Sequence, residues 1–351
     1  MTQVDIRATQ VIAPNFKKRL SGVTATVVRL VPVQSRDINI AATGPVIPAH
    51  VPQIPLWSLL TMPRSGPDGP RVWHARRNVE MIGGLALKYL LGKRLKLVFT
   101  SASQRKQSGL TRWLIRRMDA VVATSERGAA YLEGPAQVIM HGIDLEAYAP
   151  AADRAALRKK LGLPAEGLLI GCYGRIRRSK GTDVFCAAMA GVLKCFPAHA
   201  MIMGRAVPKD RAYLQSIRDG VAQHGLTDNF HFLPEVPVED MADWYRVLDL
   251  YVAPQRWEGF GLTPIEAMAC GVPVVATRVG AFEQIVTPET GALVDPDDSA
   301  ALTNAICAAF EPPRPITKWA ANARAHVAEN FSIEREATQL IALYRRLLSD
   351  S

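Results

Sequence analysis

Short apolar segments alternate with longer segments of helical periodicity through the second half of this 351-residue chain. The apolar segments are 168–174, 200–204, 229–233 and 249–254. Between them lie segments with helical spacing at 181–196, 210–226 and 238–248. Strands of this length that alternate with longer helices indicate βαβ units, and therefore a parallel sheet covered by helices on both faces.

The first half alternates in the same way, although less regularly. Its candidate strands are 10–14, 37–43, 71–75, 96–101, 120–125 and 136–142. Residues 44–70 are rich in proline and glycine and are predicted to form a long loop. A chain of this length is expected to form two domains. We therefore predict an α/β protein with one domain over 1–150 and a second over 151–330. Ligands of such sheets bind beyond the carboxyl ends of the strands, which predicts a cleft between two facing domains.

Composition is that of a globular protein, with 48% hydrophobic and 21% charged residues. Five cysteines without CxxC spacing are interpreted as reduced core thiols of a cytosolic protein: Cys172, Cys186, Cys195, Cys270 and Cys307. Asp5 and Arg7 interrupt the N-terminal stretch where a signal peptide needs an apolar core. No uncharged apolar run reaches the roughly 18 residues of a membrane-spanning helix. The expected location is cytoplasmic.

Positive charge is concentrated in the first half of the chain. Residues 1–150 contain 20 Lys and Arg against 9 Asp and Glu, and the remainder contains 22 against 23. Much of the excess lies in one stretch: Lys88, Lys93, Arg94, Lys96, Arg105, Lys106, Arg112, Arg116, Arg117 and, just beyond, Arg127. This stretch is interpreted either as a solvated helix face or as a surface that docks on the anionic inner leaflet of a membrane. Nucleic acid is disfavoured because aromatic residues are not interleaved with the basic ones.

The stretch RWEGFGLTPIEAMACGVPVVAT (256–277) contains two glutamates around a glycine-rich turn, Glu258 and Glu266. One interpretation is structural: Thr263 begins a helix, Glu266 completes a capping box, and Glu258 is a solvated loop acid. In the other, the backbone N–H groups at the helix start bind an anion, and the two carboxylates accept hydrogen bonds from hydroxyl groups. The turn residues concerned are Gly259, Phe260, Gly261, Leu262 and Thr263. A ligand with a phosphate between two hydroxyl-bearing ends, such as a nucleotide-sugar, fits this layout.

A second motif supports the ligand interpretation. In GCYGRIRRSKGTD (171–183), Arg175 and Lys180 follow a predicted strand and precede a helix, where basic side chains can hold a diphosphate. Gly22 lies at a predicted strand-to-helix turn that lets a first helix approach the same diphosphate. His74, at the end of the predicted strand 71–75, is either a hydrogen-bonded core residue or a cleft residue.

Together these motifs resemble the retaining glycosyltransferases of the GT-B fold, family 4. The resemblance rests on EGFGLTPIE (258–266), YGRIRRSKGTD (173–183), GVPVVATRVGAFEQIV (271–286), TGALVDPDD (290–298) and MHGIDLEAY (140–148), and it is weaker in the N-terminal half. VWHARRN (72–78) and the proline-rich loop look most like mannosyltransferases of the bacterial lipopolysaccharide core.

The resemblance implies a role for each site residue. Glu258 would bind hydroxyls of the donor sugar and Glu266 the ribose, while Arg175 and Lys180 would bind the diphosphate and stabilise the leaving group. Gly22 would line the phosphate pocket.

The base would contact residues 233–237, which include Glu235 and Val236. His74 would be a fourth catalytic residue beside Glu258, Arg175 and Lys180. Arg76 stands where relatives carry a second histidine, and a closing helix over 331–351 would return to the N-terminal domain.

The implied activity is transfer of a hexose, mannose from GDP-mannose, to an anionic Kdo–lipid A type acceptor at the inner face of the cell membrane. No cofactor or catalytic metal is expected, because Arg175 and Lys180 replace the metal and the Asp-x-Asp of residues 295–298 falls in a surface loop. Alternatives are a UDP-sugar transferase acting on another glycolipid or a soluble acceptor, a sugar-nucleotide epimerase, and a non-catalytic nucleotide-sugar-binding protein. A phosphorylase is disfavoured because no lysine suits pyridoxal phosphate.

Overall fold

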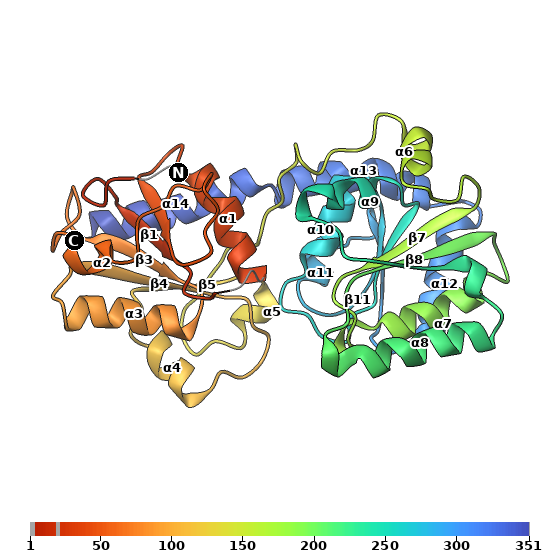
Figure 1. The fold of residues 1–351 in the computed structure, drawn as a ribbon, viewed down its shortest axis with the longest axis horizontal. Helices are drawn as coiled ribbons and strands as arrows, with labels where there is room; N and C mark the ends of the chain where they lie inside the picture. Colours follow the sequence, from red (N-terminus) through yellow and green to blue (C-terminus); the bar gives the residue numbers. More distant parts are fainter. Residues whose placement is uncertain (1–3, 19–21, 351) are drawn as a thin grey trace. The chain divides into compact units, whose positions relative to one another are not determined.

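The computed structural model describes residues 4–18 and 22–350 (Figure 1). The chain divides into two compact units. Unit 1 consists of Met1–His141 and Ile333–Ser351, and unit 2 of Gly142–Ser332. The chain therefore passes into unit 2 at residue 142, where the sequence predicted a boundary near 150, and it returns to unit 1 at 333.

Unit 1 is built on a six-stranded sheet in the order β2-β1-β3-β4-β5-β6, in which every pairing is parallel. The strands are β1 (Val11–Pro14), β2 (Ile40–Thr43), β3 (Arg71–Ala75), β4 (Leu95–Ser101), β5 (Ala120–Ala123) and β6 (Gln137–Val138). All six coincide with predicted segments. Their continuous apolar character follows from burial on both faces of a parallel sheet.

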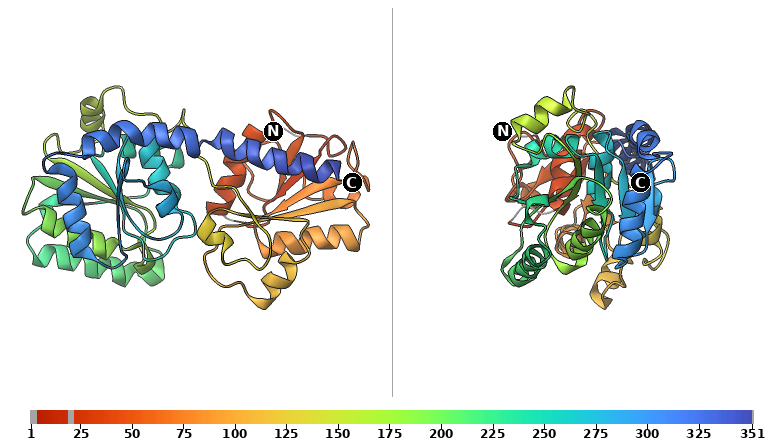
Figure 2. Two further views of the ribbon diagram at one scale, coloured as in Figure 1. Left: turned by 180° about the vertical axis from the view of Figure 1, so that it is seen from behind. Right: turned by 90° about the vertical axis from the view of Figure 1, so that its right-hand side faces the viewer.

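Helices cover both faces of the unit 1 sheet. They are α1 (Gly22–Gln34), α2 (Ser58–Thr61), α3 (Asn78–Tyr89), α4 (Gly109–Ile115), α5 (Glu126–Ala129) and α14 (Ile333–Ser349). One hydrophobic core joins α1 and α14 to the sheet, and another joins α3 and α4 to it. Figure 2 shows α14 lying across one face of the sheet. The segment 44–70, predicted as a loop, contains the single turn α2.

Unit 2 has a second six-stranded parallel sheet, in the order β12-β11-β10-β7-β8-β9. Its strands are β7 (Leu168–Tyr173), β8 (Ala198–Met203), β9 (Phe230–Leu233), β10 (Leu250–Ala253), β11 (Val274–Thr277) and β12 (Gly291–Val294). The chain builds outward from β7 to β9 and then crosses to β10 on the other side of β7. The strand order therefore reverses between β7 and β10, and ligands of such sheets bind outside the carboxyl ends at this point.

The helices of unit 2 also lie on both faces of its sheet (Figure 1). They are α6 (Arg154–Lys160), α7 (Thr182–Val192), α8 (Arg211–Gln223), α9 (Met241–Arg246), α10 (Leu262–Ala269), α11 (Phe282–Ile285), α12 (Ser299–Phe310) and α13 (Ile316–Asn330). Among the helices of the described residues, none is long and apolar enough to cross a membrane. Four cysteines are buried as predicted, whereas Cys195, beyond the end of α7, is exposed.

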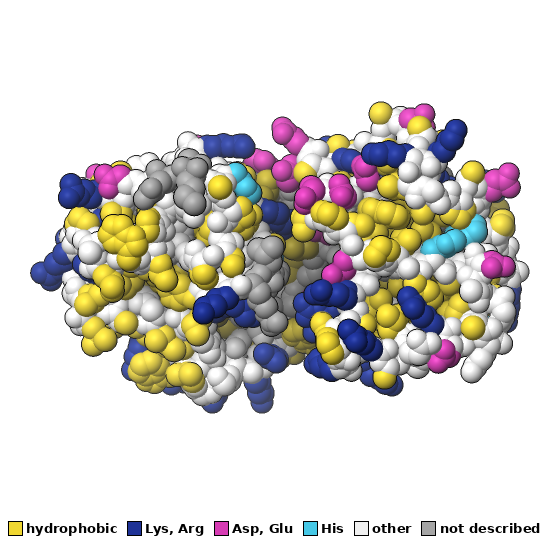
Figure 3. Space-filling model, viewed as in Figure 1, with side chains coloured by type: hydrophobic (Ala, Val, Ile, Leu, Met, Phe, Trp, Pro, Cys, Tyr) yellow, Lys and Arg dark blue, Asp and Glu magenta, His cyan; other side chains and the backbone are white. Residues whose placement is uncertain are grey.

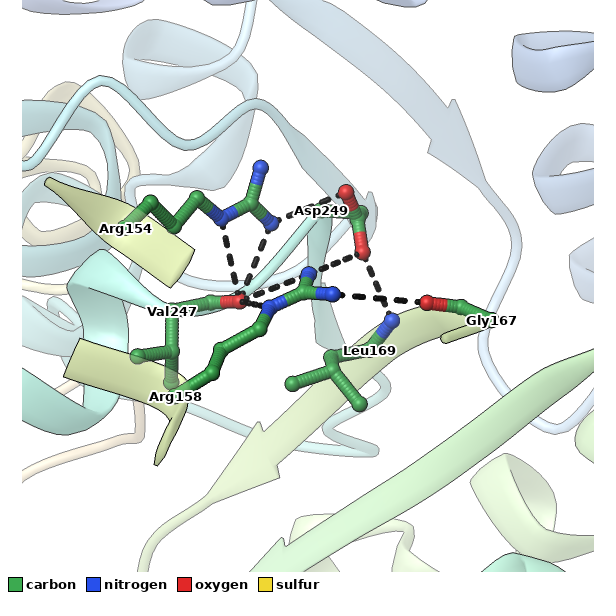
Figure 4. Close-up of polar contacts among 6 residues, drawn as sticks. All are labelled: Arg154, Arg158, Gly167, Leu169, Val247 and Asp249. Atoms are coloured by element: carbon green, nitrogen blue, oxygen red, sulfur yellow. Dashed lines mark hydrogen bonds and ion pairs between the residues drawn. The ribbon is translucent and has the colours of Figure 1, made fainter. Parts of the chain in front are cut away.

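An ionic cluster fixes the amino edge of the unit 2 sheet (Figure 4). The carboxylate of Asp249 accepts hydrogen bonds from Arg158 at 2.7 Å and from the backbone N–H of Leu169 at 2.7 Å. Arg154 pairs with the other oxygen of Asp249 at 2.9 Å, and both guanidinium groups donate to the carbonyl of Val247. The cluster ties α6 to the starts of β7 and β10, so the two strands that flank the reversal are held together at the edge opposite the predicted site.

Candidate functional site

Two loops meet at the carboxyl edge of unit 2, where the strand order reverses. Residues 174–181 follow β7 and residues 254–261 follow β10. Gly181 has φ of +70°, and a Cβ atom there would lie 1.9 Å from the carbonyl oxygen of Pro254. Gly204, after β8, is equally confined, since its Cβ would lie 1.9 Å from the carbonyl oxygen of Gly174. Only glycine permits these backbones to approach so closely.

The charged pair at this edge consists of Lys180 and Glu258. The ammonium group of Lys180, in the short 3-10 helix η1 (Arg178–Lys180), contacts Oε2 of Glu258. Oε1 of Glu258 accepts a hydrogen bond from the N–H of Gly259 at 2.9 Å. The two side chains keep 21% and 15% of their surface exposed, so both remain accessible to a ligand. An ammonium group carries three protons and can bind a phosphate oxygen while it remains paired with the carboxylate.

Arg256 links the two loops through a clamp that the sequence did not predict. Its guanidinium donates to both carboxylate oxygens of Asp183 in α7, at 2.8 and 2.9 Å, and to the carbonyl of Arg178 at 2.6 Å. Burial alone would raise the pKa of Asp183, but hydrogen bonds from Arg256 and Tyr213 outweigh it and lower that pKa. Bonding to Asp183 raises the pKa of Arg256. The clamp therefore stays charged and holds the Lys180 loop in place.

The start of α10 differs from the predicted capping box. The helix begins at Leu262, its N-cap is Gly261 with φ of +93°, and no side chain caps it. Thr263 lies inside the first turn, so the interpretation of Glu266 as a capping residue is wrong. Oε2 of Glu266 instead accepts a hydrogen bond from the hydroxyl of Tyr245 at 2.8 Å. Burial, and then the charge of Glu266, raise the pKa of Tyr245 well above its ordinary value, so the hydroxyl stays protonated and donates.

Backbone donors and an exposed cation complete this edge. The first N–H groups of a helix lack partners within the helix, and those of α10 begin beside Glu258. Arg175 is exposed two residues after the end of β7 and has no acidic partner in the described part of the chain. Phe260 is buried beneath the turn. Two cations, a helix N-terminus and two carboxylates together suit an anion flanked by hydroxyl groups.

Three other predicted site residues do not belong to the pair of Lys180 and Glu258: Glu235, Val236 and Gly22. Glu235 and Val236 follow β9, two strands from β7 in the sheet, and the exposed carboxylate of Glu235 lies 3.3 Å from Arg205. Gly22 is the first residue of α1 in unit 1 and directly follows residues 19–21, which lie outside the described residues. The contact between Lys180 and Glu258 therefore brings together only part of the predicted donor-binding residues.

His74 is buried and both of its ring nitrogens are hydrogen-bonded, which disfavours a catalytic contact. Its side chain is completely buried in unit 1. Nδ1 lies 2.6 Å from the hydroxyl of Tyr344 in α14, and Nε2 lies 2.6 Å from the hydroxyl of Thr100 in β4. Burial, and then the charge of Arg76, lower the pKa of His74 well below its ordinary value. A neutral imidazole with both nitrogens hydrogen-bonded serves to join α14 to the sheet.

The Asp-x-Asp motif is divided among separate partners. Asp297 contacts Arg256, and Asp298 caps α12 by accepting the N–H of Ala301 at 2.8 Å. Asp295 lies 3.6 Å from Arg278. Within residues 4–18 and 22–350, no group of three or more His, Cys, Asp or Glu side chains is placed to hold a metal ion.

Known proteins match the chain over nearly its full length. Residues 167–311 match the family described as Glycosyl transferases group 1. The lipopolysaccharide core biosynthesis mannosyltransferase LpsB of Rhizobium meliloti is 49% identical over 98% of this chain and 99% of its own length. Its counterpart LpcC of Rhizobium leguminosarum bv. viciae is 47% identical, over 99% of both chains. This chain belongs to the glycosyl transferases group 1 family. It is therefore a glycosyltransferase, as the motifs predicted.

A solved structure confirms the architecture of this glycosyltransferase. Alr3699/HepE of Anabaena, determined with UDP and glucose, aligns with a TM-score of 0.82 and 20% identity, over 96% of this chain and 100% of that one. At this level of identity the match speaks for the fold alone. The expected GT-B fold, with two Rossmann-like halves, is confirmed.

Changing Lys180 to alanine tests whether this edge binds a diphosphate. The ammonium group would contribute charge-assisted hydrogen bonds, so affinity for GDP and UDP should fall about tenfold or more. Isothermal titration calorimetry on wild type and variant measures the change.

Lys194→Ala is the matched control, because Lys194 is an exposed lysine of the same unit beyond the end of α7. The control should bind both nucleotides like wild type. Equal affinities of Lys180→Ala and Lys194→Ala for both nucleotides would contradict the diphosphate role.

Proposed function

We propose that this glycosyltransferase transfers mannose from GDP-mannose, with retention of anomeric configuration as in family 4, to a lipopolysaccharide core acceptor of the Kdo–lipid A type. The observation that carries the proposal is the near-full-length identity of 49% and 47% to two proteins named as lipopolysaccharide core mannosyltransferases. Both alignments include unit 1, so the likeness extends beyond the family motif of residues 167–311.

The donor binds at the carboxyl edge of unit 2 in this proposal. Lys180 and Arg175 hold the diphosphate together with the N-terminus of α10, and they stabilise the negative charge that grows on the departing GDP. This positive charge takes the place of a metal ion. Support comes from the Lys180–Glu258 contact, which places a cation and a hydroxyl acceptor side by side.

Carboxylates orient the two ends of the donor. Glu258 accepts hydrogen bonds from hydroxyls of the mannose, and Glu266, with one oxygen bound to Tyr245, presents its carboxylate to the ribose. Glu235 and Val236 are proposed to contact the base. The phosphate contact of Gly22 remains a prediction, and His74 is assigned to structure.

Glu258→Gln tests the sugar-binding role. The substitution keeps the size of the side chain but removes its charge, so a lost transition-state contact should lower turnover about a hundredfold. Turnover is measured as transfer of mannose from GDP-mannose.

The same assay in excess EDTA tests the metal-free mechanism, and wild-type activity should persist there.

Glu166→Gln serves as the control, since Glu166 is an exposed loop glutamate in the same unit. Near-normal turnover by Glu258→Gln would contradict the sugar-binding role and leave Glu258 as a solvated loop residue. Loss of wild-type activity in EDTA, restored by magnesium, would contradict the metal-free mechanism.

The structure divides the basic stretch that the sequence left either as a solvated helix face or as a membrane-docking surface. Lys93 donates to the carbonyl of Met62 at 2.6 Å, and Lys96 donates to the carbonyl of Asp350 at 3.3 Å. Both residues lie at the start of β4, whereas Arg105, Lys106 and α4 follow its carboxyl end. Lys93 and Lys96 therefore lie at the amino edge of the unit 1 sheet, Arg105 and Lys106 follow its carboxyl edge, and α4 runs between the two.

The part that follows β4 combines cations with exposed apolar side chains. Leu110 and Trp113 in α4 are 56% and 48% exposed, and the guanidinium of Arg117 lies 3.7 Å above the Trp113 ring. Val79 and Ile82 of the neighbouring α3 are also exposed. Figure 3 shows hydrophobic side chains gathered over α3 and α4. We name these four apolar residues with Arg105, Lys106 and Arg117 the docking face.

The docking face has the composition of an interfacial membrane surface, with an aromatic and aliphatic centre bordered by cations. In the proposed function, it binds the anionic inner leaflet of the cell membrane and keeps the enzyme, a cytoplasmic protein, near its glycolipid acceptor. Each basic residue near such a surface contributes about 1 kcal/mol, and salt weakens the attraction.

Replacing Arg105, Lys106 and Arg117 with glutamine should reduce binding to anionic liposomes steeply at low salt and leave donor hydrolysis unchanged. Co-sedimentation with anionic and neutral liposomes, at low and high salt, measures binding. The control replaces Arg7, Arg36 and Arg64, three exposed arginines of the same unit, with glutamine. Equal losses in both triple variants, or equal wild-type binding to both lipid types, would rule out docking through this face.

A further inference from the structure

Arg76 lies at the point where the strand order of unit 1 reverses. It follows β3 directly, and β3 pairs with β1, whose other neighbour is β2. The loops after β1 and β3 therefore begin side by side at the carboxyl edge. As in unit 2, this is the place where an α/β sheet binds its ligand.

A buried carboxylate fixes the backbone around Arg76. Glu80 is completely buried, and its Oε2 accepts the N–H of Arg76 at 2.7 Å. Its Oε1 accepts a hydrogen bond from Arg77 at 2.7 Å, and Arg77 also donates to Oδ1 of Asn15 at 2.6 Å. The turn after β3 is thus held against the turn after β1. Such fixed geometry is what a specific binding contact requires.

Charge is balanced at Arg77 but not at Arg76. Arg77 forms an ion pair with Glu80, whereas the half-buried guanidinium of Arg76 donates to the carbonyl of His74 at 3.2 Å. No carboxylate of the described residues pairs with Arg76. His74 beside it supplies no negative charge in either protonation state. A partly desolvated cation without a counter-charge favours an anionic ligand.

Unsatisfied polar atoms point to a ligand at the same edge. The side chain of Asn15 is completely buried, and its Nδ2 has no hydrogen-bond partner among the described residues. Oγ1 of Thr43, the last residue of β2, and the hydroxyls of Ser103 and Thr124, which follow β4 and β5, share this condition. Buried polar groups are normally hydrogen-bonded. All four residues lie at the carboxyl edge of the sheet, where a polar ligand is expected.

We propose that Arg76 binds an anionic oxygen group of the acceptor, a carboxylate or a phosphate, and so selects an acidic acceptor. Asn15, Arg77 and Glu80 are positioning residues that fix the turn. This inference rests on the proposed function, because it names the acceptor group that unit 1 takes while unit 2 binds the donor.

The test compares wild type, Arg76→Gln and Arg76→Lys on three acceptors: the natural glycolipid, its carboxyl-reduced form and its dephosphorylated form. With the natural acceptor, Arg76→Gln should raise the acceptor KM about tenfold or more, with little change in the donor KM. Arg76→Lys keeps the charge and should recover part of the affinity. Removing the group that Arg76 binds should abolish the difference between wild type and Arg76→Gln, which separates carboxylate from phosphate.

Arg36→Gln is the matched control, because Arg36 is exposed between α1 and β2 at the amino edge of the same sheet. Circular dichroism and GDP affinity check that each variant is folded. If Arg76→Gln folds and behaves like Arg36→Gln, or if its effect is equal on all three acceptors, the inference is overturned. Should Arg76→Gln fail to fold, the same comparison is made with Arg76→Met, which also removes the charge. Failure of wild type to transfer mannose to any acceptor would instead reject the proposed function.

Discussion

The close approach of Gly181 to Pro254 determines the site in unit 2. A side chain at position 181 would lie 1.9 Å from the Pro254 carbonyl oxygen, so only glycine lets the loops after β7 and β10 touch. This contact allows Lys180 to reach Glu258 and allows Arg256 to reach Asp183. Lys180 of the ion pair and Asp183 of the clamp lie on either side of Gly181 in the sequence. Sheet topology supplies the location, and the glycine makes the chemistry possible there.

At the carboxyl edge of its sheet, each unit has one cation paired with a carboxylate and one arginine without an acidic partner among the described residues. In unit 2 Lys180 is paired with the carboxylate of Glu258, and Arg175 is exposed in the loop after β7. In unit 1 the buried carboxylate of Glu80 balances Arg77, and the charge of Arg76 is left without an acidic partner among the described residues. A diphosphate with hydroxyl-bearing ends suits the first arrangement, and a single anionic group suits the second.

Local patterns predicted the strands well, because continuous apolar segments between helical ones have few other interpretations. Local patterns were less informative where the contacts of a side chain come from residues far away in the sequence. The sequence left His74 either as a hydrogen-bonded core residue or as a cleft residue, and the hydrogen bond to Tyr344, 270 residues later in the chain, favours the core. The Arg256–Asp183 clamp joins residues 73 apart in the chain, one from each of two motifs. At α10, the sequence pattern Thr-Pro-x-Glu suggested a capping box, but the positive φ of Gly261 starts the helix earlier.

We propose that the edge containing Lys180 and Glu258 binds GDP-mannose and that its sugar is transferred with retention. The most direct measurement is proton NMR of the newly formed glycosidic linkage after reaction of GDP-mannose and, separately, UDP-sugars with the acidic glycolipid acceptor. We expect transfer from GDP-mannose and a mannosyl product with the same anomeric configuration as the donor. A product of inverted configuration, or transfer from a UDP-sugar and none from GDP-mannose, would contradict it.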